Sequence, residues 1–347
     1  MEKKSRNIRI RWMCGILFSA FAFCWLFFFQ QDLLCAAYNK VLYGMEHPIG
    51  IQTPNRVVVA LLLTAFSQFL VLPGKFLLRF KRGQYACNYL LSAVFLGVIT
   101  IYDGNSLFGE LTIKWMVTLI FAVLLYLICK IVASIPRSDH NDRPRTLAGN
   151  LIIMATLFCI TAYVGNTEEN LHRRLRMERL YAEQDYEGVL KVGSLEEESN
   201  HTIDLLRAKS MLNLPADANP AGSRIGDLLF EYSISDPKAL SAALKEMDNT
   251  QAYLTSCLLQ ADLASFRDSL NINNYTSLPK YYLQALIIAN DTTTQEQFPD
   301  QYAKEYSEYT TFQASLAQVE SEPQQYQSNA TYIPHHQTYF WFYTFHK

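Results

Sequence analysis

The sequence predicts an all-α protein in which a block of five transmembrane helices is followed by a soluble α-helical domain, either solenoid-like or a bundle. Three observations lead to this class. Five long apolar stretches precede Gly165, the balance of charge reverses there, and the chain beyond it has the apolar spacing of short amphipathic helices. Beyond Gly165 no stretch shows the alternation that is typical of a half-buried strand.

Charge divides the chain at the same point. Residues 1–165 hold 16 Lys and Arg against 7 Asp and Glu, whereas residues 166–347 hold 14 against 25, so the net charge of −2 hides two opposite halves. Nucleic-acid binding requires clustered Lys and Arg. We therefore expect the acidic half not to bind nucleic acid.

The first apolar stretch, residues 12–29, follows a basic segment, residues 1–11, that is expected to be cytoplasmic and carries five Lys and Arg. Each Leu, Ile or Phe in the stretch favours insertion into the bilayer by about 0.3–0.6 kcal/mol. A cleaved signal peptide is the alternative, and Cys35-Ala36-Ala37 offers small residues for cleavage. Because the stretch is long for a signal core and further spans follow, we predict a retained signal anchor.

Four more stretches complete the predicted membrane block, residues 12–165. They cover residues 57–72, 87–102, 115–132 and 147–164. The second and third predicted spans are shorter than the roughly 20 residues that cross about 30 Å of hydrocarbon. Snorkelling flanks such as Arg56 and Lys75 make up the difference. Pro73-Gly74 is expected to end the second span.

The basic residues of the connecting segments set the orientation. Residues 1–11, 74–86 and 130–146 carry 13 Lys and Arg, whereas the alternating segments, residues 30–56 and 103–114, carry 3. Segments rich in Lys and Arg stay on the cytoplasmic side. We therefore expect a cytoplasmic N-terminus and, after five spans, an extracytoplasmic location for the rest of the chain.

Asp32, Glu46 and Asp103 fall in the predicted outer segments. Carboxylates at the outer membrane face suit an enzyme of envelope glycan or lipid transfer, which is the alternative function. Ordinary solvated loop charge is the simpler explanation. No charged residue lies at the centre of a span, which argues against an ion-coupled transporter. No catalytic residue is assigned.

The acidic segment, residues 166–325, is expected to form an extracytoplasmic domain of short amphipathic helices. They cover residues 168–183, 188–192, 202–214, 236–247, 253–270, 277–289 and 299–316. Such helices bury their apolar faces by stacking, as in an α-solenoid. The segment LYAEQDYEGVL, residues 180–190, resembles the turn region of tetratricopeptide repeats, although the rest of that consensus is missing. An irregular bundle is the alternative.

The C-terminal tail, residues 326–347, contains Tyr339, Phe340, Trp341, Phe342 and Tyr343 in succession. Three alternatives stay open for this aromatic segment. It docks onto the helical domain as core, it lies at the membrane–water interface where Trp and Tyr are enriched, or it binds a partner. These five residues are the candidate partner-binding residues.

No cofactor or metal site is predicted. His335 and His336 are adjacent and therefore point in different directions, and neither they nor His346 has a carboxylate or cysteine at ligand spacing. The seven cysteines include no Cys-x-x-Cys pair, and Cys257 stands alone in the acidic half. We interpret them as small apolar residues in packed positions.

Two segments carry a resemblance to a known family: residues 278–286, Leu-Pro-Lys-Tyr-Tyr-Leu-Gln-Ala-Leu, and residues 338–343, Thr-Tyr-Phe-Trp-Phe-Tyr. Together with the order of basic N-terminus, short spans and acidic helical domain, they resemble a bacterial family of uncharacterised multi-pass envelope membrane proteins with a helical, tetratricopeptide-like outer domain. The likeness covers most of the chain in layout but only about 15 residues in motif. It implies a location in the cytoplasmic (inner) membrane of a bacterium and no particular activity.

The expected function is that of an envelope scaffold or protein-interaction module presented outside the cytoplasmic membrane. It follows from the topology and from the lack of a catalytic constellation in the sequence. The expected partners are the lipid bilayer and other envelope proteins. A homo-oligomer is a further alternative.

Overall fold

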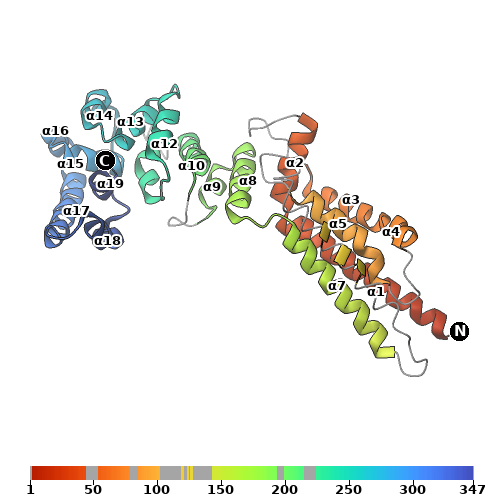
Figure 1. The fold of residues 1–347 in the computed structure, drawn as a ribbon. Coiled ribbons are helices and arrows are strands. Elements are labelled where there is room, and N and C mark those ends of the chain that lie inside the picture. The colour runs from red at the N-terminus through yellow and green to blue at the C-terminus, as the bar shows by residue number, and fades with distance from the viewer. Residues whose placement is uncertain are drawn as a thin grey trace. The chain divides into compact units, whose positions relative to one another are not determined.

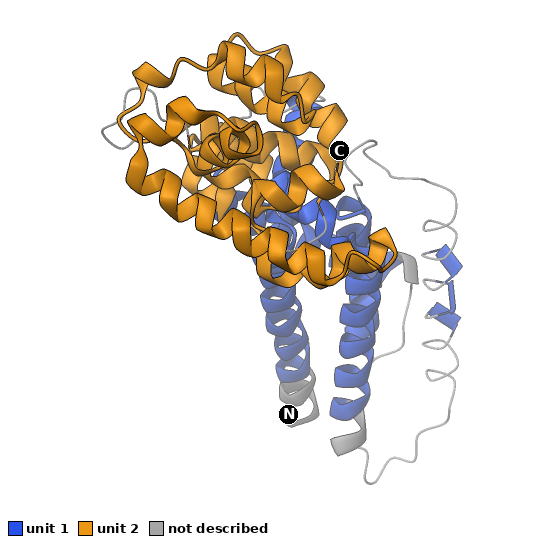
Figure 2. Ribbon diagram, turned by 90° about the vertical axis from the view of Figure 1, so that its left-hand side faces the viewer, with its two compact units in different colours: residues 1–175 blue, residues 176–347 orange. Residues whose placement is uncertain are grey.

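The computed structural model describes residues 2–43, 54–78, 85–101, 119–120, 123–124, 126–127, 143–193, 199–214 and 224–346 (Figure 1). Within these ranges the regular elements are helices and there is no strand, which confirms the all-α class. The chain divides into two compact units, residues 1–175 and 176–347 (Figure 2). The division lies inside helix α8 (Glu169–Ala182), slightly beyond the predicted boundary at Gly165.

The N-terminal unit is a helical block. Its elements are α1 (Glu2–Cys24), a π-helix η1 (Trp25–Phe29), α2 (Gln31–Tyr43), α3 (Arg56–Phe69), α4 (Val71–Leu78), a 3₁₀ turn η2 (Ala86–Tyr89), α5 (Leu90–Ile99), α7 (Arg143–Val164) and the start of α8. Helix α1 therefore begins within the predicted basic segment, residues 1–11. Helix α2 occupies part of residues 30–56, which were expected to connect two spans.

Among the described residues, three helices are long and apolar enough to cross a membrane, whereas five were predicted. They are Ile8–Phe29, Arg56–Phe76 and Leu147–Val164, which correspond to the first, second and fifth predicted spans. The match rests on length and composition. It supports the coarser conclusion that this unit is a block of helices suited to a membrane.

The third predicted span, residues 87–102, is a shorter apolar helix, Ala86–Ile99. It starts with the 3₁₀ turn η2 and ends at Ile99, because the backbone of Thr100 leaves the helical conformation (φ −106°, ψ 13°). Of the fourth, residues 115–132, only positions 119–120, 123–124 and 126–127 are described, and they are helical. The rest of that span lies outside the described residues.

The prediction that Pro73-Gly74 ends the second helix is wrong. A turn at Leu70 separates α3 from α4, and Pro73 then lies in the first turn of α4, where the missing N–H of proline is not needed. Gly74 allows close packing, because a Cβ there would come within 2.8 Å of the carbonyl oxygen of Asn88.

Helices α5 and α7 run in the same direction. At the start of η2 the N–H of Ala86 donates to Oδ1 of Asn150 (2.9 Å). Beyond the end of α5 the carbonyl oxygen of Thr100 accepts from the N–H of Asn166 (2.7 Å). Residues 86–100 therefore lie alongside residues 150–166, in parallel.

Helix α1 follows the same course. In its second half, Phe18 packs against Tyr89, which immediately precedes α5, with ring centroids 4.7 Å apart. Beyond its end, Nε2 of the buried Gln30 donates to the carbonyl oxygen of Asn166 (3.0 Å). Gly165 leaves room for the Trp25 ring, because a Cβ at this position would come within 2.8 Å of the ring. Helices α1, α5 and α7 thus begin at one end of the unit and finish at the other.

Helix α3 runs against α1. Its last turn carries Gln68, whose Nε2 donates to Oγ of Ser19 (2.8 Å) and to the carbonyl oxygen of Gly15 (3.2 Å). The same helix also contacts η1, which follows the C-terminal end of α1. The end of α3 therefore lies beside Gly15 and Ser19 of α1, which precede η1 in the chain.

The C-terminal unit contains the end of α8 and the helices that follow it. These are α9 (Tyr186–Leu190), α10 (His201–Asn213), α11 (Ile225–Leu228), the 3₁₀ turn η3 (Leu229–Glu231), α12 (Pro237–Lys245), α13 (Thr250–Leu259), α14 (Leu263–Ser269), the 3₁₀ turn η4 (Ile272–Asn274), α15 (Lys280–Ile288), α16 (Thr292–Gln297), α17 (Pro299–Gln318), α18 (Gln324–His335) and α19 (Tyr339–Phe345). Helix α10 packs on α12, and α11 packs on α13. The predicted cap at Asp236 is confirmed, because its Oδ1 accepts from the N–H of Ala239 (2.9 Å).

One turn geometry occurs three times in this unit. Gln184, Ala261 and Asn290 adopt φ angles of 61°, 56° and 55°, and each is followed by an aspartate whose side chain caps the next helix. The aspartate N–H bonds to a carbonyl five residues back, which is the Schellman helix end. The predicted single helix at residues 253–270 is therefore wrong, because this turn divides it into α13 and α14.

Replacing Ala261 with glycine is expected to stabilise the C-terminal unit by about 1 kcal/mol, because a left-handed residue with a Cβ carries a penalty of about 1–2 kcal/mol. A urea titration of the full chain in neutral-detergent micelles, read by pulse proteolysis, measures the change. Ala264→Gly, which lies inside α14, is the matched control and is expected to destabilise by up to about 1 kcal/mol. The same sign for both variants would contradict the assignment.

Candidate functional site

The predicted acidic residues of the outer face are only partly described. Asp32 lies in the first turn of α2 with a half-buried side chain. Glu46 and Asp103 lie outside the described residues. A joint role of the three in glycan or lipid transfer therefore stays a prediction.

The aromatic segment of the tail forms helix α19, and most of it belongs to the core. Tyr339, Phe340 and Phe342 are exposed by 0%, 1% and 6%, whereas Trp341 and Tyr343 are half-buried. The segment therefore docks onto its own unit. A partner could reach Trp341 and Tyr343 directly but would have to open the unit to reach the other three.

Hydrogen bonds hold α19 in place. The Thr338 hydroxyl accepts from the N–H of Trp341 (3.3 Å) and caps the helix. The N–H of Tyr339 donates to Oε1 of Gln284 (2.7 Å), and its hydroxyl donates to the carbonyl oxygen of Leu258 (2.9 Å). The tail is thus tied to α15 and α13.

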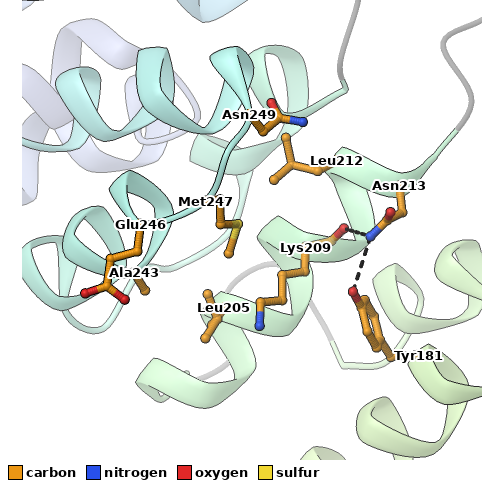
Figure 3. A pocket seen from close by; sticks show the side chains of 9 residues that line it. All are labelled: Tyr181, Leu205, Lys209, Leu212, Asn213, Ala243, Glu246, Met247 and Asn249. Carbon is orange, nitrogen blue, oxygen red and sulfur yellow. Dashed lines mark hydrogen bonds between the residues drawn. The ribbon is translucent and has the colours of Figure 1, made fainter. Parts of the chain in front are cut away.

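A groove of about 510 Å³ lies between α8, α10 and α12, all within the C-terminal unit (Figure 3). One face of α10 supplies residues at i, i+4, i+7 and i+8, and the end of α12 with the following turn supplies the opposite wall. The residues that line it are Leu205, Lys209, Leu212 and Asn213 from α10, Ala243, Glu246, Met247 and Asn249 from the opposite wall, and Tyr181 from α8.

The groove combines an apolar surface with amide and hydroxyl groups. Leu205, Leu212 and Met247 point toward the space between α10 and α12 (Figure 3). Asn249 uses its Oδ1 to accept from the N–H groups of Gln251 (2.8 Å) and Ala252 (3.1 Å), so that its amide nitrogen remains as a donor. Such a surface matches an apolar side chain together with the backbone beside it.

Tyr181 provides a neutral hydroxyl at the edge of the groove. Burial raises the pKa of this tyrosine and the neighbouring Tyr186 adds to the rise, while a hydrogen bond with Asn213 partly opposes it. The hydroxyl therefore stays protonated at neutral pH. It accepts from Nδ2 of Asn213 (3.2 Å), which leaves its own proton for a ligand.

Lys209 and Glu246 give the groove one charge of each sign. A single lysine is insufficient for binding a phosphate backbone at this groove. The nine lining residues include no nucleophile beside a general base. The arrangement suits binding of a polypeptide segment.

A buried polar network that the sequence analysis missed holds α10 in position. Asp204 is 2% exposed and accepts from the N–H (2.9 Å) and hydroxyl (2.7 Å) of Ser235, and from the hydroxyl of Ser199. The guanidinium of the buried Arg207 lies 4.6 Å from the centre of the Tyr232 ring. The sequence signal for this network was the presence of two charged residues, Asp204 and Arg207, among the apolar residues of α10.

Within the part of the chain that the structure describes, no three His, Cys, Asp or Glu side chains are placed to hold a metal ion. His335 lies 3.4 Å from Oγ of Ser315 and packs edge-on against Phe312. No protein-family model, curated protein or solved structure matches this chain. The resemblance to a bacterial envelope family therefore stays a prediction, and function has to be inferred from the geometry.

Proposed function

We propose that this chain is an integral protein of the bacterial cytoplasmic membrane that presents a helical interaction module outside the cytoplasm. The parallel course of α1, α5 and α7 is the observation that carries the proposal. It supports an odd number of crossings before the module begins. The groove between α8, α10 and α12 then receives a segment of an envelope protein.

A bilayer is the environment that the surface of the N-terminal unit requires. Large apolar side chains are exposed on every candidate span, among them Trp12, Phe28, Leu62, Phe69 and Ile152. Each contributes about 1.5–3 kcal/mol when it leaves water completely. A soluble protein rarely exposes so many.

The direction of α5 supports two further crossings in addition to the three long helices. Helix α5 ends beside Asn166, whereas α7 begins at Arg143, at the opposite end of the unit. The chain between Ile101 and Arg143 therefore has to return along the unit. The predicted fourth span, residues 115–132, has about 18 residues, or about 27 Å as a helix. We therefore keep α5 and residues 115–132 as crossings.

The distribution of Lys and Arg supports the orientation. Helices α1, α5 and α7 begin at one end of the unit, next to the basic segments at residues 1–11, 74–86 and 130–146. Basic segments stay on the cytoplasmic side. The opposite end, where α7 leads into α8, is then the outer end. The C-terminal unit follows it outside the cytoplasm.

The partner segment is expected to be extended, with an apolar side chain against Leu212 and Met247. To test this, a photo-crosslinking amino acid is placed at Lys209 in the full chain, in cells. A discrete adduct is expected that Met247→Glu abolishes, because burying a carboxylate beside Leu205 and Leu212 under a bound apolar segment is costly.

Ala242→Glu is the matched control, because Ala242 is an exposed residue of the same helix that does not line the groove. It is expected to leave the adduct at Lys209 unchanged. If both variants abolished the adduct, or neither did, the groove would not be the site. A crosslinker at Lys304, an exposed residue of α17, serves as the background control. It measures the adducts that form at any exposed position.

A further inference from the structure

The charges of four carboxylates act on a buried tyrosine in the C-terminal unit. Asp227 belongs to α11 and Glu231 to η3, whereas Glu305 and Glu308 lie one turn apart on α17. Tyr281 of α15 is 0% exposed, and α15 packs against both α11 and α17. We call the four acidic residues the carboxylate cluster. They are separated by up to 81 residues in the sequence and meet only in the fold.

Hydrogen bonds hold two of the carboxylates beside the first half of α15. Oδ1 of Asp227 accepts from the N–H of Lys280 (2.6 Å). Oε2 of the buried Glu305 accepts from Nε2 of Gln284 (2.7 Å). The two carboxylates are therefore bonded to Lys280 and Gln284, the residues one position before and three positions after Tyr281 in α15.

Among the described residues the hydroxyl of Tyr281 has no hydrogen-bond partner. Burial raises the pKa of Tyr281, and the charges of all four cluster carboxylates raise it further. A buried hydroxyl that has no partner is costly, since it has given up its bonds to water. The tyrosine therefore has a donor and an acceptor for a further polar group.

Two lysines among the described residues act on the cluster. Nζ of Lys280 donates to the carbonyl oxygen of Gln337 (3.2 Å) and lies 5.4 Å from the centre of the Tyr281 ring. Lys304 of α17 acts on Glu308. Lys280 is thus already bonded to a carbonyl oxygen.

Burial raises the pKa of Asp227, Glu231 and Glu308, while Lys280 partly opposes each rise. For such groups the neutral form is more favoured in the folded state than in the unfolded state. Their contribution to stability is therefore present at low pH and is lost as the pH rises through the raised pKa values. At neutral pH Asp227, Glu231 and Glu308 therefore destabilise the unit, as residues of functional sites often do.

We propose that the carboxylate cluster and the Tyr281 hydroxyl bind an alkylammonium group, carried by a lysine side chain of a partner or by a free polyamine. An ammonium group is compact and has three donors, so it can bond carboxylates that approach from different elements. A guanidinium prefers one coplanar carboxylate. Among the described residues no three acidic groups are close enough to hold a metal ion.

The test uses the full chain in neutral-detergent micelles and two probes, spermidine and the peptide acetyl-Gly-Lys-Lys-Gly-amide, with affinity measured by calorimetry at pH 7. Binding of at least one probe is expected, and the tighter one identifies the source of the ammonium group. The same peptide with norleucine in place of lysine is expected not to bind. Binding of neither probe would overturn the proposal.

The double substitution Glu231→Gln and Glu308→Gln is expected to weaken binding at least tenfold. The control double substitution Glu296→Gln and Glu322→Gln removes the same charge from exposed positions and is expected to change affinity less than twofold. Equal weakening by the two double variants would show unspecific attraction and reject the site. The cluster variant should also unfold at a higher urea concentration at pH 7, and wild-type protein should gain stability on mild acidification.

Tyr281→Phe separates binding from folding. Since the hydroxyl has no intramolecular partner, its removal is expected to leave the urea midpoint unchanged or raise it. Affinity for the bound probe is expected to fall about three- to tenfold. An unchanged affinity would exclude the hydroxyl from the site, and lost stability would show that it serves the fold instead.

Discussion

Truncating Phe340 to alanine is expected to destabilise the C-terminal unit by about 3–5 kcal/mol. Phe340 is 1% exposed and packs against Tyr309 and Phe312 of α17, with ring centroids 4.9 Å and 6.4 Å away. Its removal leaves a cavity that α17 and α19 cannot close, because each is fixed by other contacts. Since a domain is stable by about 5–15 kcal/mol, such a loss brings the unit close to unfolding.

The measurement for Phe340→Ala is the urea midpoint of the full chain in neutral-detergent micelles, read by pulse proteolysis. Phe345→Ala is the matched control, because Phe345 lies on the same helix and is only half-buried. Its effect is expected to be less than half as large. Equal, small effects of the two substitutions would show that the tail is not core and would favour a free segment.

Replacing Asp204 with alanine is expected to cost about 3 kcal/mol or more. The substitution removes a buried carboxylate that accepts three hydrogen bonds, and it leaves the Ser235 N–H without its acceptor. Ser199, which donates to Asp204, also accepts from Nη1 of the buried Arg207 (3.4 Å), and breaking a buried charged network is costly. Because the network ties α10 to the start of α12, the groove is expected to widen.

Asp204→Asn keeps the shape and an acceptor oxygen, so it should cost clearly less than the alanine variant. Asp248→Ala, at an exposed position, is expected to stay within about 0.5 kcal/mol of wild type. Hydrogen exchange of residues 199–214 in the full chain localises the loss. An Asp204→Ala variant as stable as Asp248→Ala would contradict the network.

Several elements could be predicted because their signals are local. Residues 147–164 contain no charge and have the length of a span, and they form most of α7. Asp236-Pro237 combines a capping carboxylate with a residue suited to the first turn, and α12 begins there. In both cases the signal lies within a few residues and tertiary contacts do not alter it.

The turn at Ala261 could not be predicted, because this left-handed position is not a glycine. Ala261 by itself favours a continuous helix. The following Asp262, which caps α14, was the local signal. A helix predicted from apolar spacing therefore ran through this turn. By contrast, the helices predicted for residues 168–183 and 277–289 end directly before the turns at Gln184 and Asn290.

The candidate sites depend on contacts between distant residues. The tail alternatives stayed open because the bond from Tyr339 to Leu258 joins residues 81 positions apart. The carboxylate cluster and the groove likewise combine residues of separate helices. No local sequence pattern specifies which of these helices pack together. The charge difference between the two halves was visible from the sequence, but the excess of carboxylates around Tyr281 was not.

The side of the membrane on which the C-terminal unit lies tests the central claim most directly. Cysteine is introduced separately at Lys238, which is exposed on α12, and at Ser138, in a predicted cytoplasmic segment. Intact spheroplasts are treated with a membrane-impermeant maleimide, and the labelled peptides are identified by mass spectrometry. We expect Lys238→Cys to be labelled at once and Ser138→Cys only after the membrane is opened. Protection of Lys238→Cys until the membrane is opened would place the unit in the cytoplasm and contradict the odd number of crossings.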